Sequence, residues 1–235
     1  METKSLSRNP SPPAPDHCVV PAASGARGER LGIGSKPAFF LDRDGVIIEE
    51  VHYLCDPSQV RPIAGSAAAV AQLNRLGIPV VVVTNQAGVA HGYFPESQVA
   101  AVHHRVDELL AAEGAFVDRY YYCPHHPLAS CRQYRVACEC RKPRPGMLLS
   151  AAQQLGLDLK RSYLVGDKLS DLEAGVRAGC RVILVHTGYG SSTVQSLDHF
   201  APERVEVAAD LAQAVKARLP DLLRRVERRE LRVES

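Results

Sequence analysis

Short apolar runs that alternate with helical patterns are the feature that most constrains the fold of this chain. Each run is rich in apolar, β-branched or aromatic residues and is bounded by polar or turn residues, as strands are. The expected strands are residues 38–41, 79–83, 118–122, 162–165 and 181–185. The expected helices are residues 66–76, with Ser66 as its N-cap and Gly77 just past its end, 95–113, 145–155 and 169–178. Alternating strands and helices predict an α/β fold with a doubly wound parallel sheet of the Rossmann type.

The two ends of the chain differ from this central pattern. Residues 1–36 are rich in Pro, Ser, Gly and Arg and lack apolar periodicity, so we expect a disordered extension. A last helix is expected over residues 207–219, against the edge of the sheet, and residues 221–235 form a charged tail, either a frayed helix or a solvated segment. A length of 235 residues with 46% hydrophobic content is enough for one domain with a full core, which we place at residues 37–220.

Charge and hydropathy exclude two classes of partner. The 28 basic and 26 acidic residues nearly cancel, and no basic run flanked by aromatic residues is present, so nucleic acid is not an expected partner. No apolar stretch reaches the roughly 20 residues that span a bilayer, and no secretory signal opens the chain. We therefore expect a cytoplasmic protein without a membrane segment.

Polar residues follow the expected strands at the points where those strands end. Asp42 and Asp44 come after the first strand, Thr84 ends the second, and Asp167 follows the fourth, with Asp171 a little further on. Because the carboxyl ends of parallel strands share one edge of the sheet, these side chains should converge. Carboxylates brought together without counter-charge repel one another, and Mg²⁺ is the cation that such an oxygen set suits.

A basic pair completes the expected site. Arg141 and Lys142 precede the helix that Pro145 opens, and together with Thr84 they could donate to a phosphoryl group bound by the same cation. An isolated Asp-x-Asp-Gly is more often a simple turn. Here polar residues recur after several strands, which favours a phosphoryl-transfer site.

Four segments resemble the motifs of haloacid dehalogenase superfamily phosphatases. They are residues 39–46 (FFLDRDGV), 83–86 (VTNQ), 141–143 (RKP) and 165–167 (VGD), and the resemblance covers about residues 37–190. It implies a phosphoric monoester hydrolase in which Asp42 forms an aspartyl-phosphate. Asp44 would protonate the leaving oxygen and then activate water.

The same resemblance implies the roles of the other motif residues. Mg²⁺ would be held by Asp42, the backbone carbonyl of Asp44, and Asp167, whereas Thr84 and Lys142 would hold phosphoryl oxygens. Asp171 would position its neighbours rather than bind the metal. Only about 40 residues separate the first two motifs, so we expect short loops and no large cap domain over Asp42.

A loop over residues 123–140 carries a second expected metal site. Cys123, His125, Cys138 and Cys140 provide a Cys₃His set of the kind that binds structural Zn²⁺ in a tetrahedron. His126 and Cys131 compete for places in this set, and the spacing alone leaves His125 and His126 as alternatives. A cluster of incidental thiols is the less favoured interpretation.

The zinc loop together with residues 83–92 (VTNQAGVAHG) is similar to the sugar bisphosphate phosphatases of that superfamily. This resemblance implies a small phosphorylated sugar as substrate, handled by a protein that could be monomeric. The residues expected to contact substrate are Glu50, Val51, His52, Tyr53, Thr84, Asn85, Gln86, Ala87, Arg141, Lys142 and Lys168. Two alternatives remain open: a histidinol-phosphate or other small sugar-phosphate phosphatase, and a zinc-loop binding module without activity.

Overall fold

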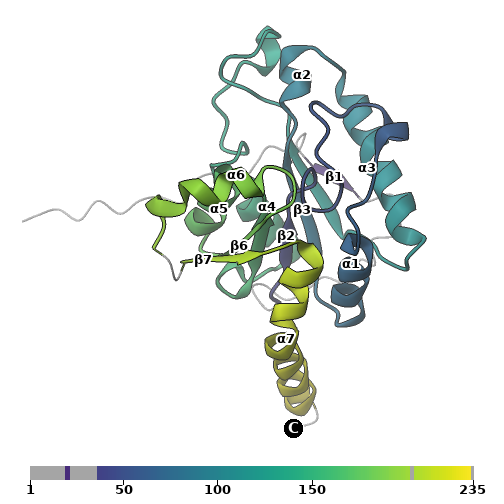
Figure 1. Cartoon of the computed structure of the whole chain (residues 1–235), viewed down its shortest axis with the longest axis vertical. Coiled ribbons are helices and arrows are strands. Elements are labelled where there is room, and N and C mark those ends of the chain that lie inside the picture. Colours follow the sequence, from purple (N-terminus) through teal and green to yellow (C-terminus); the bar gives the residue numbers. More distant parts are fainter. Residues whose placement is uncertain (1–18, 22–35, 202–203, 234–235) are drawn as a thin grey trace, which may run out of the picture.

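The fold is a single seven-stranded sheet between two layers of helices (Figure 1). The computed structural model describes residues 19–21, 36–201 and 204–233. The strand order is β1-β4-β3-β2-β5-β6-β7. Strands β2 to β7 run parallel to one another, and β1 pairs antiparallel with β4. The strands are β1 (Val19–Pro21), β2 (Phe39–Leu41), β3 (Val80–Asn85), β4 (Arg119–Cys123), β5 (Tyr163–Gly166), β6 (Arg181–Val185) and β7 (Val205–Ala208).

Helices cover both faces of the sheet. The α-helices are α1 (Ser66–Arg75), α2 (Ala87–His91), α3 (Glu96–Ala111), α4 (Gly146–Leu155), α5 (Leu169–Ala178), α6 (Gly190–Thr193) and α7 (Leu211–Val233). The 3-10 turns are η2 (Pro57–Gln59), η3 (Arg132–Tyr134), η4 (Leu159–Arg161) and η5 (Val194–His199). Apolar residues of α1, α3 and α7 pack on one face, and those of α4 and α5 pack on the other. The doubly wound α/β fold expected from the sequence is confirmed.

The central strands are apolar on both faces because both faces are covered. Phe39, Phe40 and Leu41 of β2 are fully buried, and so are the four valines that begin β3. Such continuous apolar runs are typical of parallel strands inside α/β domains. The strands and helices expected between residues 38 and 185 all appear within a few residues of their predicted bounds.

The chain order puts the pocket at the carboxyl end of β2. From β2 the chain proceeds to β3 and β4 on one side, and it then returns to β5, β6 and β7 on the other side. The chain leaves the adjacent strands β2 and β5 toward opposite faces of the sheet, to α1 and α5, and such a point is where open α/β sheets bind ligands.

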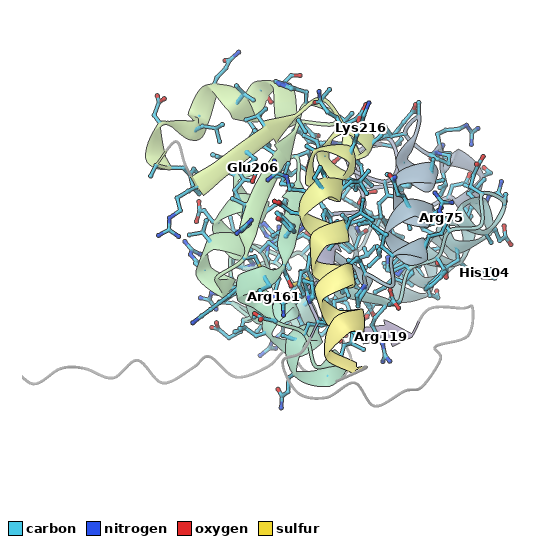
Figure 2. The ribbon with its side chains drawn as sticks, turned by 90° about the horizontal axis from the view of Figure 1, so that it is seen from below. Arg75, His104, Arg119, Arg161, Glu206 and Lys216 are labelled. Carbon is cyan, nitrogen blue, oxygen red and sulfur yellow. The ribbon has the colours of Figure 1, made fainter. Side chains whose placement is uncertain are left out.

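The C-terminal region departs from the expected helix over residues 207–219. Val205–Ala208 instead forms β7, parallel to β6, because the alternation of valine with other side chains suits a half-covered edge strand. Helix α7 then begins at Leu211 and continues through Pro220 to Val233, so most of the expected tail is helical. Figure 2 shows α7 with Arg75 and His104 on one side and Glu206 on the other.

Two smaller expectations were also wrong or outside the described residues. Gly65, not Ser66, is the N-cap of α1, and the Ser66 hydroxyl donates to the Ile47 carbonyl at 2.8 Å. The expected extension over residues 1–36 lies mostly outside the described residues, although Val19–Pro21 within it forms β1. None of the helices in the described part of the chain has the length and apolar character that a bilayer-spanning helix requires.

Candidate active site and metal centres

The loop after β2 presents Asp42 at the bottom of the pocket. Asp42 is 4% exposed, and its Oδ1 atom accepts the Arg43 backbone N–H at 2.8 Å. Gly45 follows with φ 82°, and a Cβ atom there would lie only 2.3 Å from Asp167 Oδ2. A Cβ on Gly188 would lie 2.2 Å from the same oxygen. Two glycines therefore allow the backbone to close around Asp167 from both sides.

Lys142 is the cation of the pocket, and three oxygens surround its ammonium group. Lys142 Nζ lies 3.0 Å from Asp42 Oδ1, 2.7 Å from Asp171 Oδ1 and 2.7 Å from the Val83 carbonyl. Burial opposes the charge of Lys142, but Asp171 and Asp42 outweigh it and raise the pKa of the ammonium group. Burial likewise opposes ionisation of Asp42, but Lys142 and Lys168 lower its pKa. Both groups are charged at neutral pH.

Asp167 carries a carboxylate oxygen that is buried and accepts no hydrogen bond from the described residues, with Lys168 Nζ 4.0 Å away. Its Oδ2 accepts the Tyr189 N–H at 2.8 Å, and Thr193 Oγ1 donates to its backbone carbonyl at 2.8 Å. Its Oδ1 is buried and has no hydrogen-bond donor. Burial, followed by the negative charge of Asp42, raises the pKa of Asp167 to about 8. A bound cation would relieve both effects, so this donor set fits a divalent metal.

The three expected carboxylates converge as the strand-end argument requires. Ligand oxygens of Asp42, Asp167 and Asp171 all lie within 4.8 Å of one another. The Asp171 Oδ1 atom, however, forms an ion pair with Lys142, and its Oδ2 atom accepts the Lys168 N–H at 3.0 Å. Asp171 thus holds two neighbours in place, which agrees with the positioning role expected for it.

Asp44 is held in a fork of hydrogen bonds at the wall of the pocket. Arg43 Nε and Nη2 both donate to its Oδ1, at 3.1 and 3.0 Å, and Nη2 also reaches Oδ2 at 2.9 Å. Gln86 Nε2 donates to Asp44 Oδ2 at 3.1 Å and to Thr84 Oγ1 at 2.9 Å. Because Thr84 accepts this bond, its own hydroxyl hydrogen remains available for a ligand.

Asn85 contacts the Lys142 backbone in both directions. Its Nδ2 donates to the Lys142 carbonyl at 3.0 Å, and its Oδ1 accepts the Lys142 N–H at 3.1 Å. Both polar atoms of the side chain are thereby engaged by a residue 57 positions away. The side chains of Asn85 and Gln86 thus position their neighbours, whereas Ala87 begins α2 beside them.

Residues 50–53 follow the loop that carries Asp42, and we refer to them, with Lys168 and Tyr189, as the outer wall of the site. Glu50 Oε2 lies 2.7 Å from Lys168 Nζ, and this ammonium group sits 4.6 Å from the centre of the Tyr189 ring. Burial opposes its charge, but Asp42 and Asp167 raise the pKa of Lys168. His52 Nδ1 lies 3.0 Å from the Tyr189 hydroxyl, and Val51 packs against the core.

A series of ring contacts continues outward from this wall, and we refer to it as the aromatic rim. Tyr53 meets His52 at 5.1 Å between ring centroids and Tyr93 at 4.7 Å. His91 lies 5.6 Å from Tyr93 and 5.0 Å from His126. The aromatic rim comprises His52, Tyr53, His91, Tyr93, His126 and Tyr189.

The cysteine loop brings together four ligand atoms, as expected. Cys123 Sγ lies 3.4 Å from Cys138 Sγ and 3.8 Å from His125 Nδ1. Cys140 Sγ lies 3.1 Å from Cys138 Sγ and 3.6 Å from His125 Nδ1. A tetrahedron with Zn–S bonds of about 2.3 Å requires ligand atoms about 3.4 to 3.8 Å apart. Three of the four distances fall in this range and the Cys138–Cys140 distance is shorter, so the cluster could hold zinc.

The structure separates the two histidines that the spacing left as alternatives. His125 is buried in the cluster, whereas the His126 Nδ1 atom accepts the Leu128 N–H at 3.2 Å and its ring faces His91. Burial raises the pKa of Cys123, while hydrogen bonds from the two neighbouring thiols lower that of Cys138.

The cysteine cluster is joined to the pocket through the chain and through space. Cys140 directly precedes Arg141 and Lys142, and Arg141 Nη1 donates to the His125 carbonyl at 3.1 Å. Gly146 N donates to the Glu139 carbonyl at 3.0 Å, where a Cβ atom would lie 2.4 Å from that oxygen. The Lys142–Pro143 peptide bond, which lies between Glu139 and Gly146 in the chain, is cis.

Sequence reasoning missed Arg43 and Tyr189. Arg43 stands inside the quoted motif, but nothing in the sequence indicates that its side chain holds Asp44. Tyr189 contacts Asp167, His52 and Lys168 from the loop after β6. The rule that sites gather at strand ends, applied to residues 186–190 after β6, would have found it.

Comparisons with known proteins agree with this geometry. A HAD-hydrolase-like family model matches residues 139–214. The D-glycero-beta-D-manno-heptose-1,7-bisphosphate 7-phosphatase of Escherichia coli (strain K12) is 42% identical over 183 residues, covering 77% of this chain and 95% of the relative. The enzyme of that name from Yersinia pestis is 40% identical over 186 residues, covering 78% and 97%.

Solved structures give the same result. The D,D-heptose 1,7-bisphosphate phosphatase from B. bronchiseptica, complexed with magnesium and phosphate, has a TM-score of 0.71 and 35% identity, covering 79% of this chain and 99% of that one. A putative HAD-like phosphatase from Mesorhizobium loti has a TM-score of 0.70 and 41% identity, covering 85% and 90%. The chain therefore belongs to the D-glycero-beta-D-manno-heptose-1,7-bisphosphate 7-phosphatase family of HAD-like hydrolases.

Proposed function

We propose that this chain is a magnesium-dependent phosphomonoesterase that removes the 7-phosphate of D-glycero-D-manno-heptose 1,7-bisphosphate through a phosphorylated Asp42. The observation that carries the proposal is the ion pair between the buried Asp42 and Lys142, beside the Asp167 oxygen that accepts no hydrogen bond. A nucleophile, a phosphate-binding cation and a metal ligand thus meet at one point. The names of the relatives supply the substrate.

Magnesium would be held by Asp42, the Asp44 backbone carbonyl and Asp167. When bound, it would neutralise charge on the phosphoryl oxygens, which is the largest contribution that a protein can make to this transfer. Asp167 is prepared for that role because its Oδ1 atom is buried without a donor and its carboxylate is destabilised by Asp42.

In the first step, a carboxylate oxygen of Asp42 attacks phosphorus and the bond between phosphorus and the C7 oxygen breaks. Lys142 and the Thr84 hydroxyl donate to the phosphoryl oxygens. The three N–H groups of Lys142 are directed at Asp42, Asp171 and Val83 in the free protein, so the one on Asp42 would turn to the phosphoryl group as Asp42 becomes esterified. Asp44, held by Arg43, gives its proton to the leaving oxygen.

In the second step, water attacks the phosphorus of the aspartyl-phosphate. Asp44 now lacks a proton and takes one from this water, and the phosphorus–Asp42 bond breaks to release inorganic phosphate. Gln86 keeps the Asp44 carboxylate facing the same place in both steps, because it bonds both Asp44 and Thr84.

The remainder of the substrate would lie against the outer wall. Arg141 and Lys168 supply positive charge, near His126 and Glu50 respectively. We propose that these cations and residues 50–53 bind the sugar and its second phosphate. The Cys₃His cluster would hold structural zinc, because all four positions of a tetrahedron would be filled by protein atoms and none would remain for water.

The test is hydrolysis of heptose 1,7-bisphosphate, followed by phosphorus NMR, with histidinol phosphate and fructose 1,6-bisphosphate assayed in parallel. We expect the 7-phosphate to be released, the 1-phosphate to survive, and the heptose bisphosphate to have the highest kcat/KM. An equal or higher kcat/KM for histidinol phosphate would favour the alternative substrate. A complete lack of phosphate release from all three, and from p-nitrophenyl phosphate, would leave a binding module.

A further inference from the structure

Behind the catalytic loop lies a buried polar group that the chemistry described so far does not use. His103 of α3 is 2% exposed, and neither of its ring nitrogens has a hydrogen-bond partner. Arg43 is 1% exposed, and its Nη1 atom also has no partner. Buried polar atoms without partners are rare, since each costs about 1–3 kcal/mol. Three of them on the same side of the sheet therefore require an explanation.

Both residues lie near Tyr120, on the side of the sheet that α1 and α3 cover. Leu41, Val82 and Tyr120 form one row across β2, β3 and β4, and all three belong to the core on the α1 and α3 side. The charge of Arg43 acts on both Tyr120 and His103, which places its guanidinium group near these two residues. His103 lies on that face too, because its ring stacks on Tyr120 with centroids 4.3 Å apart.

The chemistry of the two side chains is complementary. Burial and then the positive charge of Arg43 lower the pKa of His103 well below its usual range, so the ring is neutral and has one lone pair to offer. Arg43 Nη1 carries N–H groups that need an acceptor. The two side chains form no direct hydrogen bond with each other, and buried polar groups left in this way are commonly satisfied by a bridging water molecule.

We infer that His103 is a positioning residue, which fixes Arg43 through a buried water molecule and thereby fixes the carboxyl group of Asp44. The observed contacts run from the Asp107 carboxylate, which accepts the Tyr120 hydroxyl at 2.7 Å, through the Tyr120 ring to the stacked His103 ring. The inferred water joins His103 to Arg43. Arg43 Nε and Nη2 then hold Asp44. The inference rests on the proposed role of Asp44 as general acid and base.

A purely structural role for His103 leads to a different expectation. If the ring only filled space beside Tyr120, phenylalanine would keep the stacking and remove two unsatisfied nitrogens, which is neutral or stabilising. If the ring holds Arg43, phenylalanine would leave the guanidinium Nη1 without its bridge, and Asp44 would lose its fixed geometry. Displacements of about 1 Å at a catalytic group can cost on the order of 10²-fold in rate.

The first measurement is the rate of phosphoenzyme formation in a single turnover, with two leaving groups. A sugar phosphate needs a proton from Asp44 to leave, whereas p-nitrophenolate leaves without one. For His103→Phe we expect the rate with heptose 1,7-bisphosphate to fall by about tenfold or more, and the rate with p-nitrophenyl phosphate to stay within about threefold. His103→Gln, which keeps a donor and an acceptor, should restore most of the lost rate.

The matched control is His104, the next residue of α3. Its side chain is 64% exposed and lies 3.5 Å from Glu108, so His104→Phe should change neither rate. Equal rates for His103→Phe and wild type with both substrates would overturn the inference. So would an equal loss with both substrates, because that pattern indicates general damage to the pocket.

Failure of the Asp44 assignment can be distinguished from failure of the inference. Asp44→Asn should also lose rate with the sugar phosphate but not with p-nitrophenyl phosphate, and by more than His103→Phe. If Asp44→Asn showed no such dependence on the leaving group, the general-acid role itself would be refuted. If Asp44→Asn shows it and His103→Phe does not, only the role of His103 is refuted. A high-resolution crystal structure of the unmodified protein gives an independent readout: we expect a water within about 3 Å of both Arg43 Nη1 and a His103 nitrogen. A dry contact with carbon atoms at this point would contradict the inference even if His103→Phe failed to fold.

Discussion

The bottom of the pocket and its aromatic rim are built in opposite ways. At the bottom, Asp42 is 4% exposed, Lys142 3% and Asp167 0%, and every one of these side chains is fixed by an ion pair or a hydrogen bond. On the rim, Tyr53 is 42% exposed and Tyr93 62%, and the contacts are between rings. Under the proposed function, the buried groups would handle the phosphoryl group common to all phosphomonoesters, and the exposed rings would face the part of the substrate that differs.

This difference teaches where change is tolerated. Removing one partner of a buried ion pair leaves an uncompensated charge, which costs about 3–5 kcal/mol, whereas exposed contacts are worth far less. Substitutions at the bottom should therefore affect every substrate alike. Substitutions on the rim should alter discrimination between substrates and leave the chemistry intact.

The largest expected effect is that of Asp42→Asn. Asparagine has nearly the same shape but lacks the anionic oxygen, so turnover should disappear for heptose 1,7-bisphosphate and for p-nitrophenyl phosphate alike. Lys142 keeps Asp171 and the Val83 carbonyl as partners, so the fold should survive. Steady-state phosphate release and the melting temperature are the measurements. Turnover of either substrate within about tenfold of wild type would remove Asp42 from the role of nucleophile.

The second largest effect is expected for Cys140→Ser. Its activity should be reduced by on the order of 10²-fold, because Cys140 anchors the backbone from which Arg141 and Lys142 project. Elemental analysis should find about one zinc per chain in wild type and less in the variant, with a lower melting temperature. Mg²⁺ should still be required for the remaining activity.

Cys131→Ser is the matched control for this experiment. Cys131 lies in the same loop but outside the four-residue cluster, so its replacement should keep both zinc and activity. Full activity in a zinc-free protein would show that the loop needs no metal to place Lys142.

The buried His103 should make the free energy of unfolding depend on pH. Burial and Arg43 lower its folded-state pKa, so as the pH falls below about 6.5 the unfolded chain takes up a proton that the folded chain refuses. The free energy of unfolding should therefore decrease by up to about 1.4 kcal/mol per pH unit on this account. Urea unfolding between pH 7 and pH 5 should show a smaller decrease for His103→Phe than for wild type. Identical slopes would place the titration elsewhere.

Tyr93→Ala on the rim should have the smallest effect. Loss of an aromatic contact worth about 0.5–1.5 kcal/mol should raise KM for heptose 1,7-bisphosphate by about two- to tenfold and leave kcat unchanged. The kinetics with p-nitrophenyl phosphate should not change. The matched control is Phe116→Ala. Phe116 is 43% exposed and precedes β4, at the opposite end of the sheet from the aromatic rim. A large loss of kcat in Tyr93→Ala would break the distinction between bottom and rim.

How much the sequence could predict follows from the range of the interactions concerned. The convergence of Asp42, Thr84 and Asp167 depends only on strands that end beside one another, and local patterns are enough to find those strands. Partners chosen through space could not be found in this way. Asn85 binds the Lys142 backbone across 57 positions, and Ser66 turns to Ile47 instead of capping its helix.

The two metal centres show the same limit. Spacing predicted the cysteines of the zinc loop, but His125 and His126 are adjacent, and only the turn of the chain at Leu128 decides which ring enters the cluster. The short edge strand β7 was mistaken for the start of a helix because its stability comes from pairing with β6, which local periodicity does not contain.

The most direct test of the central claim is to locate the phosphoryl group during turnover. Asp44→Asn should slow hydrolysis of the phosphoenzyme while still accepting phosphate from p-nitrophenyl phosphate, whose leaving group needs no acid. After an acid quench, mass spectrometry of the peptides should find one phosphoryl group, on Asp42. Turnover by wild type with no phosphorylated peptide at any time, or a phosphoryl group on another residue, would contradict the account.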